Sequence, residues 1–495
     1  LMKRYSDNVK IFANAYVSVE LMKGLKYKLN LTPDFQFYRY NSYEGLFDFG
    51  LAKHDITAVT EQQTRTRNIL VENLLTFDRT FGDHKVSALV GYTYQDSRYR
   101  YMQGSGQGMP TGITEIDAAS QGLAVSGNSS RSVLTSILGR AFYSYKNRYL
   151  LTATIRRDGS SKFGSNYRYG NFPSVSVGWN IAEEDFVKNS VSWLDQLKLR
   201  GGYGVLGNQE IDNYQYVSVV TTGINYPDGK SGLIQGAFPK TFANPDIKWE
   251  ETAMTNVGID FMALRNRLTL TADWYVKNTK DILLNVPIPI STGGANDPIR
   301  NAGKIRNQGF EFNLGWNESL NKDLSYGVSF LGTYNKNEVV EMGAESQVIT
   351  GGTIHGGTYT SRTLAGYPIG GFWLIPTDGY FNSTEEVQAH QKDGVLIQPS
   401  AEPGDIRFKD TNNDGTINDE DRVYCGSPFP KFTYSINGNI TYKNVDFSIG
   451  FQGVTGNKIY NATKLELTDV TRGTNYLAST LDYWTPENQN ASSPR

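Results

Sequence analysis

The sequence predicts an all-β protein, a transmembrane antiparallel β-barrel with long extracellular loops and short periplasmic turns. About fourteen stretches alternate apolar and polar residues, as strands with one apolar face do. Their connections differ on the two sides, with tight hairpins on one side and long loops on the other. The 31 Tyr, 24 Phe and 7 Trp suit the aromatic girdles at the two membrane surfaces.

The alternation is clear in residues 25–32, where the apolar Leu25 and Tyr27 are interleaved with the charged Lys26 and Lys28. Many such runs exceed the length of strands in soluble proteins and match what a tilted strand needs to cross a bilayer. Strand length therefore favours a membrane protein. The predicted strands cover residues 9–22, 24–40, 65–81, 84–100, 131–146, 148–158, 172–182, 195–205, 252–264, 266–280, 305–318, 322–336, 431–443 and 444–453.

Short connections rich in Gly, Asn and Asp separate many of these strands, because these residues supply the positive φ angles of tight hairpins. We place these turns at the periplasmic rim and the long connections outside the cell. The short connections include residues 22–24, 82–84, 146–148, 265–266, 321–323 and 443–444. The long connections cover residues 41–64, 101–130, 206–251, 281–304 and 337–430.

Two connections are predicted to contain helix. The connection 183–194 is longer than the others on its side, and we expect a helical turn there with Trp193 packed against the barrel end. In the largest loop, Ser383 followed by Glu386 forms a capping box that opens a short helix ending near Gly394. We therefore expect this loop to be ordered.

The composition excludes several other classes of protein. A net charge of −2 with mixed charge placement argues against a nucleic-acid partner. No run of eighteen apolar residues predicts a membrane-spanning helix, and the start at Leu1 lacks the apolar core of a signal peptide. We therefore expect a further N-terminal part. The single cysteine, Cys425, allows no internal disulfide and is predicted to be a small structural residue.

Residues 410–421 match the spacing of a calcium-binding loop, with oxygen ligands at positions 1, 3, 5, 7, 9 and 12. Gly415 permits the sharp turn, and Asp421 stands where a standard loop has Glu, which favours weak binding or Mg²⁺. No helix pair flanks the loop, so we expect a structural clip. A solvated turn rich in Asp and Asn is the alternative. The predicted ligands are the side chains of Asp410, Asn412, Asp414, Asn418 and Asp421 and the carbonyl of Thr416.

The sequence shows no catalytic constellation. The four histidines are scattered without ligand spacing, and neither a Ser nucleophile elbow nor a Cys and His pairing is present. The glycine-rich residues 104–108 lack the Lys and the Ser or Thr of a phosphate-binding loop. We expect no enzyme activity and no cofactor beyond a structural Ca²⁺ or Mg²⁺.

Five segments carry ordered motifs. They are R-D-G-S-S-K-F-G at 157–164 with F-P-S-V-S-V-G-W at 172–179, L-K-L-R-G-G-Y-G at 197–204 with G-N-Q at 207–209, N-P-D-I-K-W-E-E at 244–251, K-D at 280–281 and N-A-G-K-I-R-N-Q-G at 301–309. Through these motifs the chain resembles the SusC/RagA type of TonB-dependent outer-membrane transporters.

The resemblance implies a barrel of 22 strands closed by an N-terminal plug. Residues 1–495 would form one partial barrel domain, with the plug and the TonB-contacting box before Leu1 and the closing strands after Arg495. About fourteen strands present and about four missing at each end would make up the 22. The resemblance also implies the outer membrane of a Gram-negative, Bacteroidota-like cell, a SusD-like lipoprotein lid, and energy supplied through TonB.

The resemblance implies a large cargo, with an oligosaccharide first, a peptide second, and cobalamin or chelated iron behind them. Aromatic residues of the long loops are candidates for stacking on sugar rings above the lumen. Packing of the loops on themselves explains these residues equally well. The candidates are Tyr226, Phe238, Phe242, Tyr359, Phe372, Trp373 and Tyr380.

Two other classes of function stay open at this stage. The first is a passive outer-membrane porin, which an upstream plug and a TonB box would exclude. The second is a soluble or surface β protein that binds glycans without transport, since a period of two does not say whether the apolar face looks inward or toward lipid.

Overall fold

The structure is a computed structural model in which the chain divides into two compact units, described separately below. The first unit comprises Leu1–Asn266 and Lys277–Ala302, and the second comprises Arg267–Val276 and Gly303–Arg495. The predicted loops 206–251, 281–304 and 337–430 fall partly outside the described residues. The structure describes residues 2–50, 52–218, 220–229, 232–239, 242–286, 291, 297–343, 348–354, 358–470 and 475–495.

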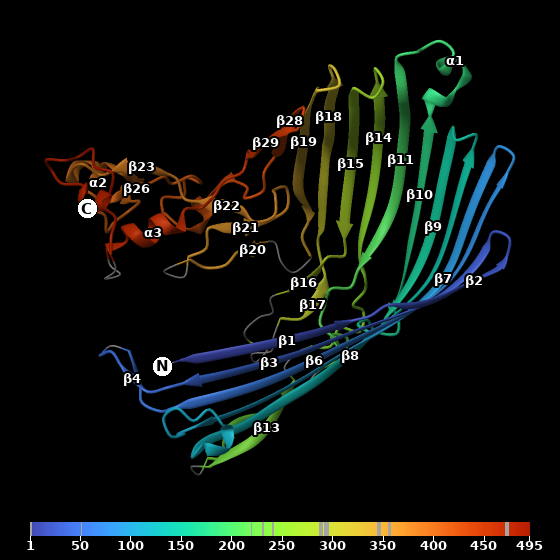
Figure 1. The fold of residues 1–495 in the computed structure, drawn as a ribbon. Helices are drawn as coiled ribbons and strands as arrows, with labels where there is room; N and C mark the ends of the chain where they lie inside the picture. Colours follow the sequence, from blue (N-terminus) through green and yellow to red (C-terminus); the bar gives the residue numbers. More distant parts are fainter. Residues whose placement is uncertain are drawn as a thin grey trace. The chain divides into compact units, whose positions relative to one another are not determined.

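The first unit holds the long strands drawn from blue to green in Figure 1. Their order in the sheet is β1-β3-β6-β7-β8-β9-β10-β11-β14, with β2 also paired to β3. Each strand pairs mainly with its neighbour in sequence, as in an up-and-down sheet. The strands are β1 (Lys3–Phe12), β2 (Ala15–Met22), β3 (Leu25–Glu44), β6 (Ala58–Phe81), β7 (His84–Gln107), β8 (Gln121–Tyr145), β9 (Tyr149–Ser160), β10 (Tyr169–Asn180), β11 (Leu194–Asn208) and β14 (Glu250–Ala263).

The second unit contains four further long strands in the order β18-β19-β28-β29. Strand β15 (Leu268–Lys280) is divided between the two units at Val276. With β15, the largest sheet of the chain has 15 strands. The strands of the second unit are β18 (Lys304–Ser319), β19 (Leu324–Glu341), β28 (Phe432–Tyr442) and β29 (Val445–Thr455).

These strands confirm the all-β prediction and correct two of its details. The predicted strand 9–22 is two strands, β1 and β2, because the backbone breaks at Ala13, whose N–H donates to the carbonyl of Pro33 at 3.1 Å. Strands β6, β7 and β8 are 24, 24 and 25 residues long and extend well into the predicted loops 41–64 and 101–130. Counted from the hairpin turns, these strands are therefore paired over a greater length than the apolar alternation predicted.

The apolar side of the long strands is exposed. Leu75 pairs with Val90, and Tyr92 pairs with Ile137, so all four side chains share one face of β6, β7 and β8. Val90 and Ile137 are each 60% exposed. A soluble sandwich would bury this face in a core, whereas a membrane barrel presents it to lipid. We call the face that carries Val90 the outward face.

The predicted hairpin turns are present, but the residues with positive φ differ in part from expectation. Gly24 and Gly82 have φ of +84° and +58°, as the glycines of tight turns should. Other turns place residues with large side chains in this region, among them Lys146, Leu264 and Lys443. Leu264 has φ of +60°, a left-handed backbone conformation that is disfavoured for a bulky L-residue. The backbone N–H of Leu264 donates to the carbonyl of Trp193 at 2.7 Å, which helps to hold this turn.

The connection 183–194 contains the predicted helical turn, formed by the 3-10 turn Ile181–Glu183 and α1 (Asp185–Lys188). Its anchor is Glu184, which accepts from the Tyr149 hydroxyl at 2.6 Å and from Trp179 Nε1 at 3.0 Å. These hydrogen bonds lower the pKa of Glu184 from its ordinary value. The ring of Trp193 lies 6.4 Å from that of Phe261 in β14, so Trp193 contacts the end of the sheet as predicted, although 53% of the residue stays exposed. The polar contacts of Glu184 hold the rest of this segment.

The first unit has a buried apolar cluster that joins several of the motif segments. Phe163, Phe172, Ile247 and Trp249 pack together with Ile211. The rings of Phe163 and Trp249 lie 5.0 Å apart, and Trp249 Nε1 donates to the carbonyl of Arg168 at 3.2 Å. Residues distant in sequence therefore pack in one small core. This packing accounts for the buried apolar residues in the motifs at 157–164, 172–179 and 244–251.

Short hairpins occupy the long connections of the first unit. They are β4–β5 (Phe47–Asp48 and Lys53–His54), β12–β13 (Val220–Pro227 and Leu233–Pro239) and β16–β17 (Leu283–Asn285 and Ile299–Asn301).

The helices of the chain are short. Among the described residues, none is long and apolar enough to cross a membrane.

Candidate functional site

The described residues of the largest loop of the second unit are ordered, as predicted, and they form small sheets that the sequence did not predict. One sheet has the order β20-β21-β22-β27, and two two-stranded sheets, β23–β26 and β24–β25, are also present. In Figure 1 these elements are orange to red. The strands are β20 (Ile349–Thr350), β21 (Ser361–Thr363), β22 (Gly371–Leu374), β23 (Thr377–Tyr380), β24 (Gln391–Lys392), β25 (Val395–Leu396), β26 (Ile406–Phe408) and β27 (Val423–Gly426).

Helix α2 (Thr384–Ala389) begins at the predicted capping box. The Ser383 side chain accepts from the Glu386 N–H at 3.3 Å, and the Glu386 carboxylate reaches back to the Asn382 N–H at 2.8 Å. The helix ends at Ala389, so the predicted end near Gly394 is wrong. Gly394, with φ of +84°, instead forms the turn between β24 and β25. A glycine suited to a helix C-terminus equally suits a hairpin, and the sequence does not distinguish them.

Residues 410–418 form a tight loop held by side-chain to backbone hydrogen bonds. Asp410 accepts from the N–H groups of Asp414 and Gly415 at 3.1 and 2.7 Å. Asp414 accepts from the N–H and the hydroxyl of Thr416 at 2.8 and 2.9 Å. Asn412 and Asn418 both donate an amide hydrogen to Asp414 Oδ2, at 3.0 and 3.2 Å. The first five predicted ligands therefore lie together.

The hydrogen bonds around Asp414 give it an unusual acidity. The amide of Asn412 and then the N–H and hydroxyl of Thr416 lower the pKa of Asp414 to about 2. The carboxylate therefore keeps its negative charge at any physiological pH. A permanently charged carboxylate is the ligand that a hard divalent cation prefers.

Asp421, the sixth predicted ligand, is fully buried. One of its oxygens accepts from the Thr411 N–H at 2.7 Å and the other accepts from the Asn418 N–H at 2.8 Å. With Asn418 it completes a capping box for the 3-10 turn Asp419–Asp421. Asp421 thus closes the loop by tying its two ends together, and no hydrogen bond joins it directly to Asp410 or Asp414 among the described residues.

The loop gathers oxygen atoms that could hold a cation. The half-buried Asp410 carboxylate accepts from the Asp414 N–H, and the Asp414 carboxylate is exposed in the same turn. Side-chain oxygens of Asn412 and Thr416 are hydrogen-bonded to the same residue, so oxygen ligands of the kind Ca²⁺ prefers are gathered there. Among the described residues, no group of three or more His, Cys, Asp or Glu is arranged to hold a metal ion. The fit thus depends on amide, hydroxyl and carbonyl oxygens as well as carboxylates.

Arg422 connects this loop to the aromatic residues, and sequence reasoning missed it. Its guanidinium donates to Asp419 at 2.7 Å and to the carbonyls of Tyr359 and Trp373 at 3.2 and 3.1 Å. The ion pair with Arg422 lowers the pKa of Asp419, and Arg362 adds a second ion pair to Asp419 at 3.2 Å. The only signal in the sequence is an arginine directly after the calcium-like loop, which does not identify partners fifty to sixty residues away.

Two of the aromatic candidates in this loop are packed within it. The guanidinium groups of Arg362 and Arg422 both lie 5.8 Å from the centre of the Tyr359 ring. Trp373 packs against Tyr367 and Tyr424, with ring centres 4.7 and 5.8 Å apart. The alternative of loop self-packing therefore describes both Tyr359 and Trp373 well.

The other aromatic candidates lie on short strands, except Phe242, which lies outside the strands. Tyr380 is half-buried in β23, opposite Ile406 of β26, and Phe372 is half-buried in β22. In the first unit, Tyr226 and Phe238 lie near opposite ends of the β12–β13 hairpin. Tyr226 and Phe242 are exposed, whereas Phe238 is half-buried. Each of the two units thus contains some of the aromatic candidates.

Comparison with known proteins gives matches along nearly the whole chain. A family model described as "TonB dependent receptor-like, beta-barrel" matches residues 4–492. TonB-dependent receptor P3 of Formosa agariphila is 30% identical over 494 residues, which are 98% of this chain and 48% of that protein. TonB-dependent receptor SusC of Bacteroides thetaiotaomicron is 33% identical over 340 residues, 67% of this chain and 32% of that protein.

Among solved structures, the RagAB peptide transporter superposes with a TM-score of 0.84 at 22% identity, covering all of this chain and 53% of that chain. At this identity the likeness shows the fold, and it confirms the barrel predicted from the strand pattern. The chain spans about half the length of the relatives and structures it matches.

Proposed function

Because the chain belongs to the TonB dependent receptor-like β-barrel family, we propose that it forms the barrel of an energised outer-membrane importer of large nutrients. The observation that carries the proposal is the family match over residues 4–492 together with long strands whose apolar face is exposed. The proteins of this family lie in the outer membrane, in agreement with the location predicted from the sequence.

The proposed cargo is an oligosaccharide. Exposed aromatic side chains on the loops support this, because sugars bind by stacking on aromatic faces. In the second unit, a hollow of about 200 Å³ is lined by Tyr334, Tyr424 and Phe429 next to Lys336 and Glu338, which combines aromatic faces with hydrogen-bonding groups. A peptide is the second candidate, since the structural relative RagAB is named a peptide transporter.

The proposed partners are a SusD-like lipoprotein at the outer side and TonB at the periplasmic side. Both follow from the likeness to SusC, of which the match covers 32%, and both belong to the whole protein. We assign no catalytic role to any residue of this chain.

We further propose that residues 410–418 hold a divalent cation, Ca²⁺ or Mg²⁺, as a structural clip. Asp410 and Asp414 would supply the charged ligands, with Asn412, Asn418 and the Thr416 carbonyl as neutral ones. Asp421 would close the shell from its buried position. The bound ion would neutralise part of the negative charge that Asp410 and Asp414 carry.

The transport proposal is tested by deleting the gene for the whole protein and measuring uptake of fluorescent oligosaccharides and peptides by the cells. We expect uptake of an oligosaccharide to disappear with the gene and to stop when a protonophore removes the energy source. Uptake that depends on the gene but continues in de-energised cells would favour the porin instead. Uptake of peptides alone would mean that the cargo is a peptide, and the proposal of an energised importer would stand.

The cation proposal is tested by calorimetric titration of Ca²⁺ and of Mg²⁺ into the detergent-extracted protein after treatment with a chelator. Asp414→Asn removes one charged ligand and should weaken binding about tenfold or more. Glu420→Gln, which changes an exposed neighbouring carboxylate outside the predicted ligand set, is the matched control. Equal heats for the two variants would assign any binding to another part of the protein.

A further inference from the structure

The outward face of β6, β7 and β8 changes from apolar to arginine-rich along the same strands. Arg67 of β6 is the register partner of Arg98 of β7, which in turn faces Arg131 of β8. Two residues further from the hairpin turn between β6 and β7, Arg65 is the register partner of Arg100. We call these five arginines the arginine patch. They share the face of Val90 because Arg98 and Arg100 are an even number of residues from Val90. The same holds for Arg65 and Arg67 relative to Leu75, and for Arg131 relative to Ile137.

The arginine patch carries more positive charge than its own carboxylate neutralises. Asp96 is 6% exposed and receives Arg131 at 2.7 Å, Arg98 at 3.1 Å and Arg67 at 3.2 Å. A single carboxylate thus holds three guanidinium groups. Among the described residues, neither Arg65 nor Arg100 forms an ion pair, and Arg65 rests against the ring of Phe37 at 5.5 Å. The patch has a surplus of about four positive charges.

The position of the patch along the strands places it at the outer surface of the membrane. Arg67 is fifteen residues from Gly82 in the periplasmic turn between β6 and β7. A strand tilted by roughly 45° rises about 2.3 Å per residue, so Arg67 stands roughly 35 Å above that turn. The apolar band of such barrels is about 25 Å tall. The arginines therefore lie just beyond the apolar band, at the level of the outer lipid headgroups.

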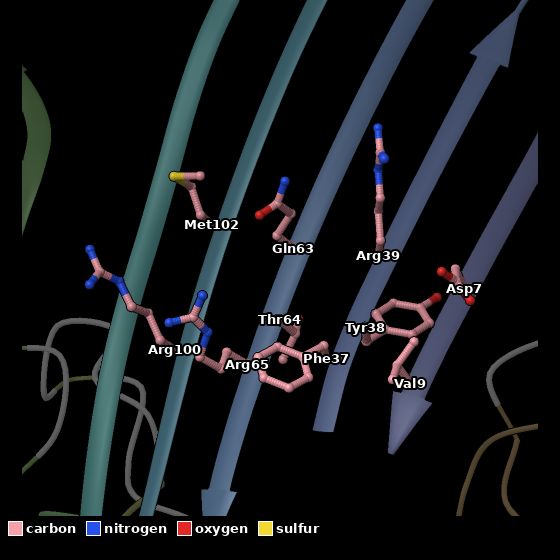
Figure 2. Close-up of a pocket in the computed structure, with 10 residues that line it drawn as sticks. All are labelled: Asp7, Val9, Phe37, Tyr38, Arg39, Gln63, Thr64, Arg65, Arg100 and Met102. Carbon is pink, nitrogen blue, oxygen red and sulfur yellow. The ribbon is translucent and has the colours of Figure 1, made fainter. Parts of the chain in front are cut away.

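The surface around Arg65 and Arg100 is hollowed. A depression of about 390 Å³ is lined by both arginines together with Arg39, Gln63, Phe37 and Met102. Figure 2 shows Arg65 and Arg100 on neighbouring strands with the Phe37 ring beside them. Two unpaired guanidinium forks beside apolar side chains match a group that is anionic at one end and attached to acyl chains at the other.

We propose that the arginine patch binds the phosphate of a phosphorylated glycolipid in the outer leaflet of the outer membrane. Arg65 and Arg100 contact the phosphate, while Arg67, Arg98 and Arg131, fixed by Asp96, supply the positive field around it. The acyl chains continue along the apolar outward face toward Val90 and Ile137. The inference rests on the outer-membrane location and the strand register, and it does not depend on the cargo.

The test is native mass spectrometry of the protein extracted from outer membranes in detergent, with added lipid A as probe. Phosphorylated lipid A should be retained, and the double variant Arg65→Gln/Arg100→Gln should lower its retention about tenfold or more, because two charge-assisted contacts are lost. Both single variants should show smaller losses. Arg79→Gln, on the outward face of β6 at its periplasmic end, is the matched control and should retain the lipid.

Two further arms identify the source of the phosphate. Lipid A without its phosphate should bind no better to the wild type than to the double variant, and equal retention of the two lipids would overturn the proposal. Displacement of the lipid by millimolar inorganic phosphate would assign the patch to the free ion instead. Full retention of phosphorylated lipid A by the double variant, with loss of a co-purifying protein, would assign it to a protein partner.

Folding is checked separately, by the difference in gel mobility between heated and unheated samples. The double variant leaves Asp96 and its three arginines unchanged, so its folded mobility should equal that of the wild type. A failure of oligosaccharide uptake in cells would refute the proposed function without affecting this result, since the lipid is measured on the extracted protein.

Discussion

The long strands of the first unit and the ordered loop of the second unit place their apolar and polar groups in opposite ways. On the strands, Val90 and Ile137 are exposed and the opposite face carries buried polar groups such as Ser136. In the loop, Trp373 is packed among other rings, and the charged Asp421 is buried with its hydrogen bonds satisfied. One region is arranged for contact with lipid and the other for contact with water.

This contrast shows that the two regions are held by different forces. The strands are fixed by continuous backbone pairing, with every register step from Ala58 to Phe81 matched in β7. In the described part of the loop the strands are two to four residues long, so hydrogen bonds and ion pairs of side chains must stabilise it where backbone pairing stabilises the long strands. Asp421 and Arg422 supply those contacts. A substitution in the strands should therefore change stability through contact with lipid. A substitution in the loop should change stability through lost hydrogen bonds.

The largest effect is expected for Asp421→Ala. The change leaves the buried N–H groups of Thr411 and Asn418 without an acceptor, at about 1–3 kcal/mol each, so the loop should lose about 4 kcal/mol of local stability. Hydrogen exchange of residues 410–422 should accelerate while that of β6 stays unchanged. Glu420→Ala, at an exposed neighbour, should cost less than about 0.5 kcal/mol. Equal exchange in the two variants would contradict the role of Asp421.

The second effect tests the strands with a matched pair. Val90→Arg places a charge on the lipid-facing side of β7, at a cost of about 2–4 kcal/mol near the bilayer midplane. Leu89→Arg places the same charge one residue earlier, on the opposite face, where it should cost much less. The folded fraction in outer membranes, measured by heat-modifiable gel mobility, should fall for Val90→Arg alone. Similar folded fractions would mean that the outward face is wrongly assigned.

The same contrast explains how much could be read from the sequence. The period of two and the hairpin turns predict nearly every long strand, because both signals are local and repeat along the chain. The split at Ala13 was missed since no Gly or Pro marks it. Residues 410–421 were recognised because their spacing is also local. The contacts of Arg422 with Tyr359 and Trp373 join residues far apart in the chain, and no pattern in one sequence predicts them.

A third, smaller effect is expected for Ser383→Ala at the start of helix α2. The change removes the acceptor for the Glu386 N–H and should cost about 1 kcal/mol. The effect should stay within the loop, as faster hydrogen exchange over residues 384–390. Ser383→Asp keeps an acceptor at the N-cap and should restore protection. If Ser383→Ala also weakened protection in β28, the loop and the strands of the second unit would share one cooperative unit, and the comparison above would fail.

The smallest effect is expected from pH and concerns Asp414. Its pKa is lowered to about 2 in the folded protein, chiefly by the Asn412 amide and the Thr416 N–H. A lowered folded pKa means that this contribution to stability is complete above pH 4 and is lost as the pH falls through about 2. Because the group is exposed to solvent, the change should be confined to the turn.

Protection of the amides of residues 411–418, corrected for intrinsic exchange rates, should therefore stay level from pH 7 to about pH 4 and then decrease. Asp414→Asn, which cannot titrate, should show a smaller decrease over the same interval. A loss of protection that begins above pH 5 in the wild type would point to another titrating group. In that case the acidity of Asp414 would not be what keeps the turn charged and ready to hold a cation.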